Sequence, residues 1–181
     1  GYLIKMLGKP ISDAVEARLY AYATYLVTRR GEVSSNYLSN LRDYLDKSQG
    51  EDWKKTVTGT YVAAIYKMLQ HEEDAEALVG DYVWSRSGNA FFDNALANDA
   101  QHMTLLARHF PKRLTTIGGE GLLKIVEPLS HDRYNTLSSA YSILALDGYA
   151  REAAKLQAGV FGAAEIDKDG KKTVLNLLPG I

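Results

Sequence analysis

The sequence predicts a mainly α-helical fold of antiparallel helix pairs that repeat about every 40 residues, followed by a short β-hairpin. Three observations lead to this prediction. Apolar residues recur at helical spacing in seven separate stretches of the chain. Several of these stretches look like copies of one helix. After Ala154 the helical spacing stops, and two short apolar runs flank a turn sequence.

The composition is that of an ordinary globular protein with one domain. The 181 residues are 46% hydrophobic and 24% charged, with a net charge of −1. This balance gives no electrostatic signal for nucleic acid or for a membrane surface. The chain has no cysteine, which excludes disulfides, thiolate metal sites and a thiol nucleophile within these residues. Because it begins with GYLIKMLGKP and not with Met, we expect a piece of a longer protein.

Most of the seven predicted helices have their own start and stop signals. The first runs from about Ser12 to Arg30, where Asp13 and Glu16 are spaced as a capping box and Gly31 ends the helix. The second helix is predicted to start at Ser34 or Ser35 and to end at Gly50, the third starts at Asp52 and the fourth near Asp74. The fifth runs from about Asp93 to Phe110, before Pro111. The sixth starts after Gly118, Gly119 and Gly121, and the seventh starts at Asn135 or Thr136.

The repeat appears when ARLYAYATYLVTRRG, GTYVAAIYKMLQHEE and YNTLSSAYSILALDGYA are aligned with the fifth helix. Equivalent positions are separated by 39, 40 and 39 residues. These positions are Ala21, Thr60, Ala100 and Ser139, and further along Leu26, Ile65, Leu105 and Leu144. The repeated helices are rich in small residues, which allow close approach of neighbours on both sides. We therefore expect them to form an inner layer, with the intervening helices outside it.

The last part of the chain is predicted to be a separate unit. Residues 1–154 form the helical repeat, and residues 155–181 form a β-hairpin that is a candidate start of an adjoining β-domain. The sequence DKDG between its two apolar runs is typical of a hairpin turn. The same loop partly matches a calcium-binding EF-hand at Glu165, Asp167, Asp169 and Gly170, but not at Lys172 and Asn176. The turn is the favoured interpretation.

One helical face carries residues that could in principle bind a metal or transfer protons. Asp99, His102 and His109 lie with Leu106 along one side of the fifth helix. Their spacing is not a known ligand motif, and HEEDAE at His71 lacks the second histidine of a zinc protease. A structural role is favoured, because paired titratable groups are often structural. No catalytic, cofactor-binding or metal-binding residue is assigned.

Other patterns also favour structural roles. The glycines of TTIGGEGLLK follow no strand and lack the lysine of a phosphate-binding loop, which indicates a loose helix start. Twelve tyrosines without interleaved basic residues are typical of core and rim positions.

Two alternative functions remain open from the residues. A peptide-binding scaffold of tetratricopeptide or HEAT type fits helix pairs, but the spacing exceeds the about 34 residues of tetratricopeptide units. An α/α-barrel enzyme, such as a glycosidase or a terpene cyclase, would need acids at the ends of its inner helices. Helix capping already explains the candidates for that role, which are Glu51, Asp52, Asp93 and Asp132.

The stretch LLKIVEPLSHDRYNTLSSAYSILALDGYA resembles the later part of the thioester-type helical domain of bacterial alpha-2-macroglobulins. ARLYAYATYLVTRRGEVSSNYLSNLRDYLD resembles an earlier helix pair of that domain. The resemblance covers roughly Ala14 to Ala154. Its most specific part is the run Asn135, Thr136, Ser138, Ser139, Ala140 and Tyr141.

The resemblance implies part of an α/α toroid in a large multidomain inhibitor that traps proteinases. In that family a bait segment is cleaved, the molecule rearranges, and many members then capture the proteinase through a Cys–Gln thioester. Without cysteine, no thioester residue can be assigned here. Either the thioester lies before Gly1, or the chain belongs to a branch that lacks it.

The resemblance also sets expectations for the surroundings of the chain. They are a periplasmic location within a larger secreted or membrane-anchored protein, and no enzyme activity or cofactor. The expected partners are neighbouring β-domains and, through the full-length protein, target proteinases. Nucleic acid and direct membrane contact are not expected.

Overall fold

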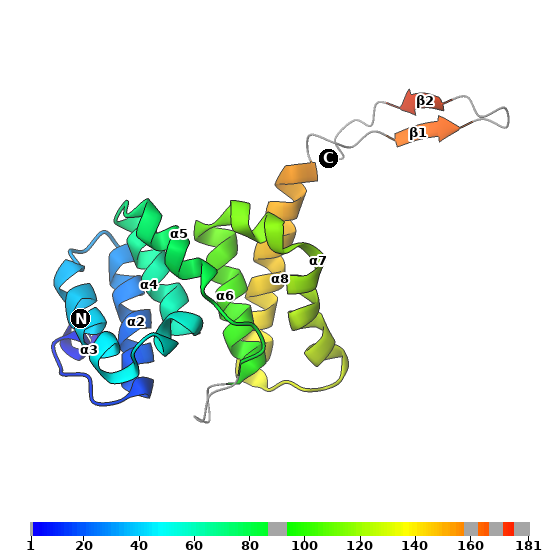
Figure 1. The fold of residues 1–181 in the computed structure, drawn as a ribbon. Coiled ribbons are helices and arrows are strands. Elements are labelled where there is room, and N and C mark those ends of the chain that lie inside the picture. Colours follow the sequence, from blue (N-terminus) through cyan, green and yellow to red (C-terminus); the bar gives the residue numbers. More distant parts are fainter. Residues whose placement is uncertain (1, 87–93, 158–162, 167–171, 176–181) are drawn as a thin grey trace.

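The structure is a computed structural model that describes residues 2–86, 94–157, 163–166 and 172–175. It is mainly helical, as the sequence predicts (Figure 1). The helices are α1 (Tyr2–Leu7), α2 (Ala14–Arg29), α3 (Ser35–Gln49), the 3₁₀ helix η1 (Asp52–Lys55), α4 (Val57–Met68), α5 (Glu72–Gly80), α6 (Ala95–His109), α7 (Pro111–Ser130) and α8 (Thr136–Gln157).

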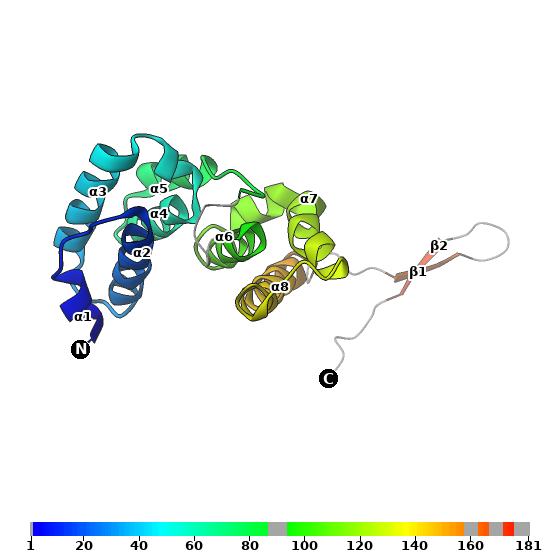
Figure 2. The same cartoon turned by 90° about the horizontal axis from the view of Figure 1, so that it is seen from below.

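The helices form two layers. Helices α2, α4, α6 and α8 pack side by side in that order, and α3, α5 and α7 each pack on the preceding inner helix. Seen from below, the inner row is curved and the outer helices lie on its convex side (Figure 2). The four inner helices are the four aligned copies of the sequence repeat, so the predicted helix pairs are confirmed. This arrangement is consistent with part of an α/α toroid.

The two middle inner helices are almost completely buried because each has inner neighbours on both sides. Every residue from Val57 to Ile65 in α4 is buried, as is every residue from Leu96 to Met103 in α6. Close packing explains the small residues. A Cβ added at Gly148 of α8 would lie 3.0 Å from the Cβ of Ala107 in α6. A larger side chain there would push these two helices apart.

The two end helices expose apolar side chains, since among the described elements each has an inner neighbour on one side only. Leu19 of α2 is 54% exposed and Ile143 of α8 is 68% exposed. Leu144 is 53% exposed, although its equivalents in α4 and α6 are buried. The repeat therefore sets the same type of residue at each position, and the number of neighbours decides its burial.

Several predicted helix starts are confirmed by their caps. The Asp13 carboxylate accepts a hydrogen bond from the Glu16 N–H at 2.8 Å, which starts α2. The Asn94 side chain likewise accepts from the Ala97 N–H at 2.7 Å at the start of α6. These short polar side chains satisfy N–H groups that the first helical turn leaves without partners.

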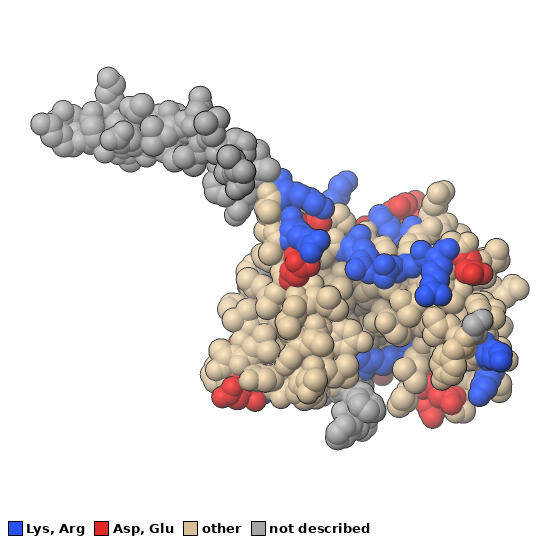
Figure 3. All heavy atoms as spheres, turned by 180° about the vertical axis from the view of Figure 1, so that it is seen from behind, with Lys and Arg blue, Asp and Glu red and all other residues tan. Residues whose placement is uncertain are grey.

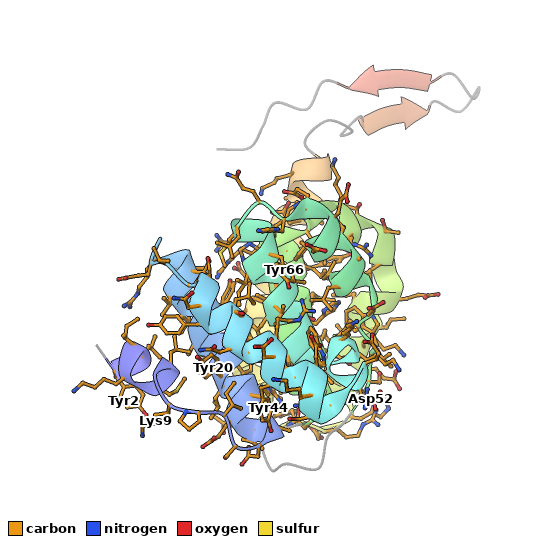
Figure 4. All side chains as sticks on the ribbon, turned by 60° about the vertical axis from the view of Figure 1, so that its left-hand side comes forward. Tyr2, Lys9, Tyr20, Tyr44, Asp52 and Tyr66 are labelled. Carbon is orange, nitrogen blue, oxygen red and sulfur yellow. The ribbon has the colours of Figure 1, made fainter. Side chains whose placement is uncertain are left out.

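Two predicted helix starts are wrong, and one short helix is not predicted by the sequence. Helix α7 begins at Pro111 rather than after the glycines, because proline fits the first helical position and a packed helix of 20 residues tolerates glycine. Asp52 starts the 3₁₀ helix η1, and Thr56 caps α4 by accepting from the Thr58 N–H. The short α1 has no predicted counterpart; it packs Leu7 into the core, while Tyr2 lies at the edge of the molecule (Figure 4).

The C-terminal part contains two strands, β1 (Ala163–Ile166) and β2 (Lys172–Leu175). They pair antiparallel, with Ala163 opposite Leu175 and Ile166 opposite Lys172. Residues 167–171, which include the predicted turn and three of the four matching EF-hand positions, lie outside the described residues. The hairpin therefore stays a prediction. So does the division at residues 154 and 155, although α8 continues to Gln157.

Candidate functional site

The acidic residue of the predicted α6 face is held in a buried polar cluster. Both oxygens of Asp99 accept from the Ser85 N–H at 3.1 Å, and one also accepts from the Tyr82 hydroxyl at 2.8 Å. Burial raises the pKa of Asp99 to about 6, although both hydrogen bonds oppose the shift. The carboxylate thus anchors the segment after α5 onto α6.

His102 belongs to the same cluster. Its Nδ1 lies 2.8 Å from the Thr60 hydroxyl of α4. The imidazole ring stacks on Tyr82. It also packs against Trp84 in a T-shaped arrangement, with the two ring centroids 5.0 Å apart. Burial, and then the charge of Arg113, lower the pKa of His102 to about 3. The ring is therefore neutral at pH 7 and packed, which suits a structural role better than proton transfer.

His109 lies apart from that cluster. Its Nε2 is 3.0 Å from the hydroxyl of Tyr25 on α2. Burial lowers the pKa of His109 to about 4, with further lowering by Arg108, Arg29 and Lys67. Asp99 and His102 thus share the cluster around Tyr82, whereas His109 contacts α2. Within the described ranges, no three His, Asp or Glu side chains are placed to hold one metal ion.

The acids considered for a barrel enzyme do not converge either. Glu51 pairs with Lys54, and Asp52 lies 3.4 Å from the ammonium of Lys55. Asp132 occupies a left-handed turn position with φ of 53°. Asp93 lies outside the described residues. The described acids are exposed and far from a shared catalytic geometry, so the structure offers no support for that alternative.

The tyrosines divide between core and rim, as the sequence predicts. Tyr20 is buried and its hydroxyl donates to the carbonyl of Leu7 at 2.7 Å, which ties α1 to α2. Figure 4 shows Tyr20, Tyr44 and Tyr66 on α2, α3 and α4. Tyr61 is also buried and its hydroxyl donates to Gln101 at 2.8 Å, which joins α4 to α6. Burial raises the pKa of Tyr61 well above its ordinary value.

The concave face contains a pocket of about 440 Å³ that the sequence did not predict. Its lining comes from all four inner helices and combines aromatic, aliphatic and charged side chains. Figure 3 shows this face, with Lys and Arg side chains gathered toward one end of it. One signal was present in the sequence: Arg29 and Arg108 stand three residues after Leu26 and Leu105, at equivalent repeat positions. Both arginines line the pocket.

Comparison with curated proteins decides the family. An alpha-2-macroglobulin of Rickettsia conorii is 31% identical over 171 residues, which cover 93% of this chain and 9% of that protein. An alpha-2-macroglobulin of Pasteurella multocida is 36% identical over 143 residues, or 75% of this chain and 8% of that protein. The chain belongs to the bacterial alpha-2-macroglobulin family. An alpha-2-macroglobulin homolog of Yersinia pestis is 31% identical over 160 residues, 84% of this chain and 8% of that protein.

The macroglobulin resemblance noted from residues 14–154 is thereby confirmed. The chain spans less than a tenth of the length of each of these alpha-2-macroglobulins. No protein-family model matches the chain, and no solved structure matches it. Among the helices in the described part of the chain, none is long and apolar enough to cross a bilayer.

Proposed function

We propose that this chain is a structural part of a bacterial alpha-2-macroglobulin-like, broad-spectrum proteinase inhibitor and catalyses no reaction itself. The observation that carries the proposal is the match to three alpha-2-macroglobulins over 75–93% of the chain. The two-layered helix array gives it physical support, because a densely packed array transmits force as a unit. Inhibition belongs to the longer protein, of which this chain matches a small share.

The proposed role is mechanical. The array docks on neighbouring β-domains, one of which starts with residues 155–181, through an interface that breaks after bait cleavage. Apolar side chains exposed on α2 and α8 are suited to packing against further parts of such a protein. The balanced charge of the chain suits an interface between domains, which is of modest area and partly polar. We propose a periplasmic location, within a secreted or membrane-anchored protein, with or without a thioester elsewhere.

The test uses the full-length protein. Limited proteolysis with a broad-specificity proteinase should cut one exposed segment outside residues 1–181, and small-angle scattering should then record a change of overall shape. The 181-residue chain, mixed with the same proteinase, should neither inhibit it nor hydrolyse a substrate. If the intact protein is cut without a change of shape, and the proteinase keeps full activity on large substrates, the inhibitor proposal is wrong.

A peptide-binding scaffold is the second candidate, and the pocket on the concave face favours it. Helical arrays of this kind commonly bind extended segments along their concave faces. The two candidates are compatible within one large protein, because one concerns trapping by the whole and the other a local binding surface.

A further inference from the structure

One part of the concave pocket is formed by two guanidinium groups that have no acidic partner among the described residues. Arg29 and Arg108 both line the pocket, and in the described part of the chain neither makes an ion pair with a carboxylate. The pocket's two acids already have partners of their own. Asp147 pairs with Arg151 at 3.0 Å, and Glu152 pairs with Lys155 at 2.6 Å. The pocket thus carries positive charge that the described side chains do not neutralise.

A tyrosine holds these two cations in place. The guanidinium of Arg29 lies 5.6 Å from the ring centroid of Tyr25, and Arg108 Nη1 donates to the Tyr25 hydroxyl at 3.4 Å. The same hydroxyl also lies 3.0 Å from Nε2 of His109. Tyr25 itself is only 3% exposed. Both cations are therefore positioned against one fixed side chain before any ligand arrives.

Helix dipoles alone do not account for this arrangement. Arg29 and Arg108 lie in the last turns of α2 and α6, where a cation stabilises the partial negative charge of the helix end. A cation anywhere around that turn would serve this purpose. Here the equivalent repeat positions direct two arginines from different helices to one pocket.

The remaining walls of the pocket are largely apolar. They include Tyr22, Tyr61 and Tyr141, whose rings come from three different helices, and the exposed side chain of Leu144. The rings of Tyr22 and Tyr61 pack edge to face with centroids 5.4 Å apart. Apolar walls with a few convergent polar groups are typical of ligand sites. A ligand matching these walls combines apolar side chains with one anionic group.

We propose that this pocket binds an acidic peptide segment, with a carboxylate held by Arg29 and Arg108 and neighbouring apolar side chains against the tyrosines. Guanidinium groups match the planar, two-oxygen geometry of a carboxylate. A peptide is favoured over a small free anion because the pocket lies in the broad concave face, over which a segment can extend (Figures 2 and 3). The site goes beyond the proposed inhibitor role and does not depend on it.

Isothermal titration calorimetry of the 181-residue chain tests the proposal with two probes, acetyl-Leu-Glu-Leu-amide and its neutral counterpart acetyl-Leu-Gln-Leu-amide. The acidic probe should bind at least about tenfold tighter, as expected for charge-assisted hydrogen bonds. Arg29→Gln and Arg108→Gln should each remove most of this preference. Arg30→Gln is the matched control: it removes a neighbouring exposed cation that does not line the pocket.

Tyr25→Phe provides a second, independent variant, because it keeps the ring beneath Arg29 and removes the hydroxyl that positions Arg108. It should weaken the acidic probe and leave the neutral probe unchanged. Circular dichroism verifies the fold of each variant. Equal binding of the two probes, no binding of either, or an equal loss in Arg30→Gln would overturn the proposal. Inorganic phosphate that competes as well as the acidic peptide would show a general anion site and also overturn it.

Discussion

The phenol ring of Tyr82 lies parallel to the imidazole of His102, with centroids 3.8 Å apart and ring planes 9° apart. The hydroxyl of the same tyrosine donates to Asp99, one turn earlier on α6. A single side chain thus covers a histidine and binds a carboxylate, and both titratable groups are removed from water. Because burial disfavours charge on either group, the cluster links the stability of the fold to pH.

His102 should lower stability on acidification. In the unfolded chain a histidine gains a proton near pH 6.5, whereas the folded pKa of His102 is about 3. The stabilisation that comes from the neutral, buried His102 is therefore complete above pH 6.5, and it is lost as the pH falls toward 3. Between pH 7 and 5 the unfolding free energy of the wild type should fall by about 2 kcal/mol more than that of His102→Phe. Urea denaturation at both pH values measures this difference. His71→Asn, at an exposed site, should behave as the wild type, and an unchanged pH slope in His102→Phe would contradict the prediction.

Asp99 should have the opposite effect on the pH dependence of stability. Its folded pKa of about 6 exceeds the ordinary 3.8, so the folded chain holds this proton more tightly than the unfolded chain. Its effect destabilises the fold increasingly as the pH rises from 4 to 6. Asp99→Asn should gain stability relative to the wild type by up to about 3 kcal/mol between pH 4 and 7. Asp132→Asn is the exposed control, and a variant difference that stays constant with pH would disprove this account.

Gly59 should tolerate no side chain. A Cβ there would lie 2.4 Å from the backbone oxygen of Lys54, where η1 packs against the first turn of α4. Backbone cannot move aside as a flexible side chain can, so Gly59→Ala should cost about 2 kcal/mol or more in unfolding free energy. Gly119→Ala is a control of opposite sign, because nothing lies within 4 Å of its Cβ. It should stabilise α7 by about 0.5 to 1 kcal/mol, and thermal denaturation of both variants would measure the contrast.

The exposed apolar side chains of the end helices should bind hydrophobic dye. Leu19 and Ile143 are more than half exposed, so Leu19→Gln with Ile143→Gln should reduce anilinonaphthalene sulfonate fluorescence without lowering the melting temperature. Leu41→Gln, at a fully buried position, should instead lower the melting temperature strongly. Dye binding that persists in the double variant would place the apolar surface elsewhere.

The sequence predicted those elements whose signals are local. The carboxylate of Asp13 caps its own helix, and the 39–40-residue spacing identified the four inner helices before their packing was known. The start of α7 was mispredicted because Pro111 both ends one helix and begins the next, and only packing shows that the second continues through its glycines. Helix α1 is short, and its stability depends on burying Leu7 beside Tyr20, which its own sequence does not show.

The sequence by itself determined the helix pairs and the order of the two layers, because these depend on spacing along the chain. Its similarity to known alpha-2-macroglobulins showed the family. Tertiary structure alone decided which residues meet. Asp99, His102 and His109 share a helical face, yet Asp99 and His102 both contact Tyr82, whereas His109 contacts Tyr25 of α2. Arg29 and Arg108 lie 79 residues apart and line one pocket. Contacts between residues so distant in sequence depend on how the inner helices curve and pack. Curvature is a property of the whole array.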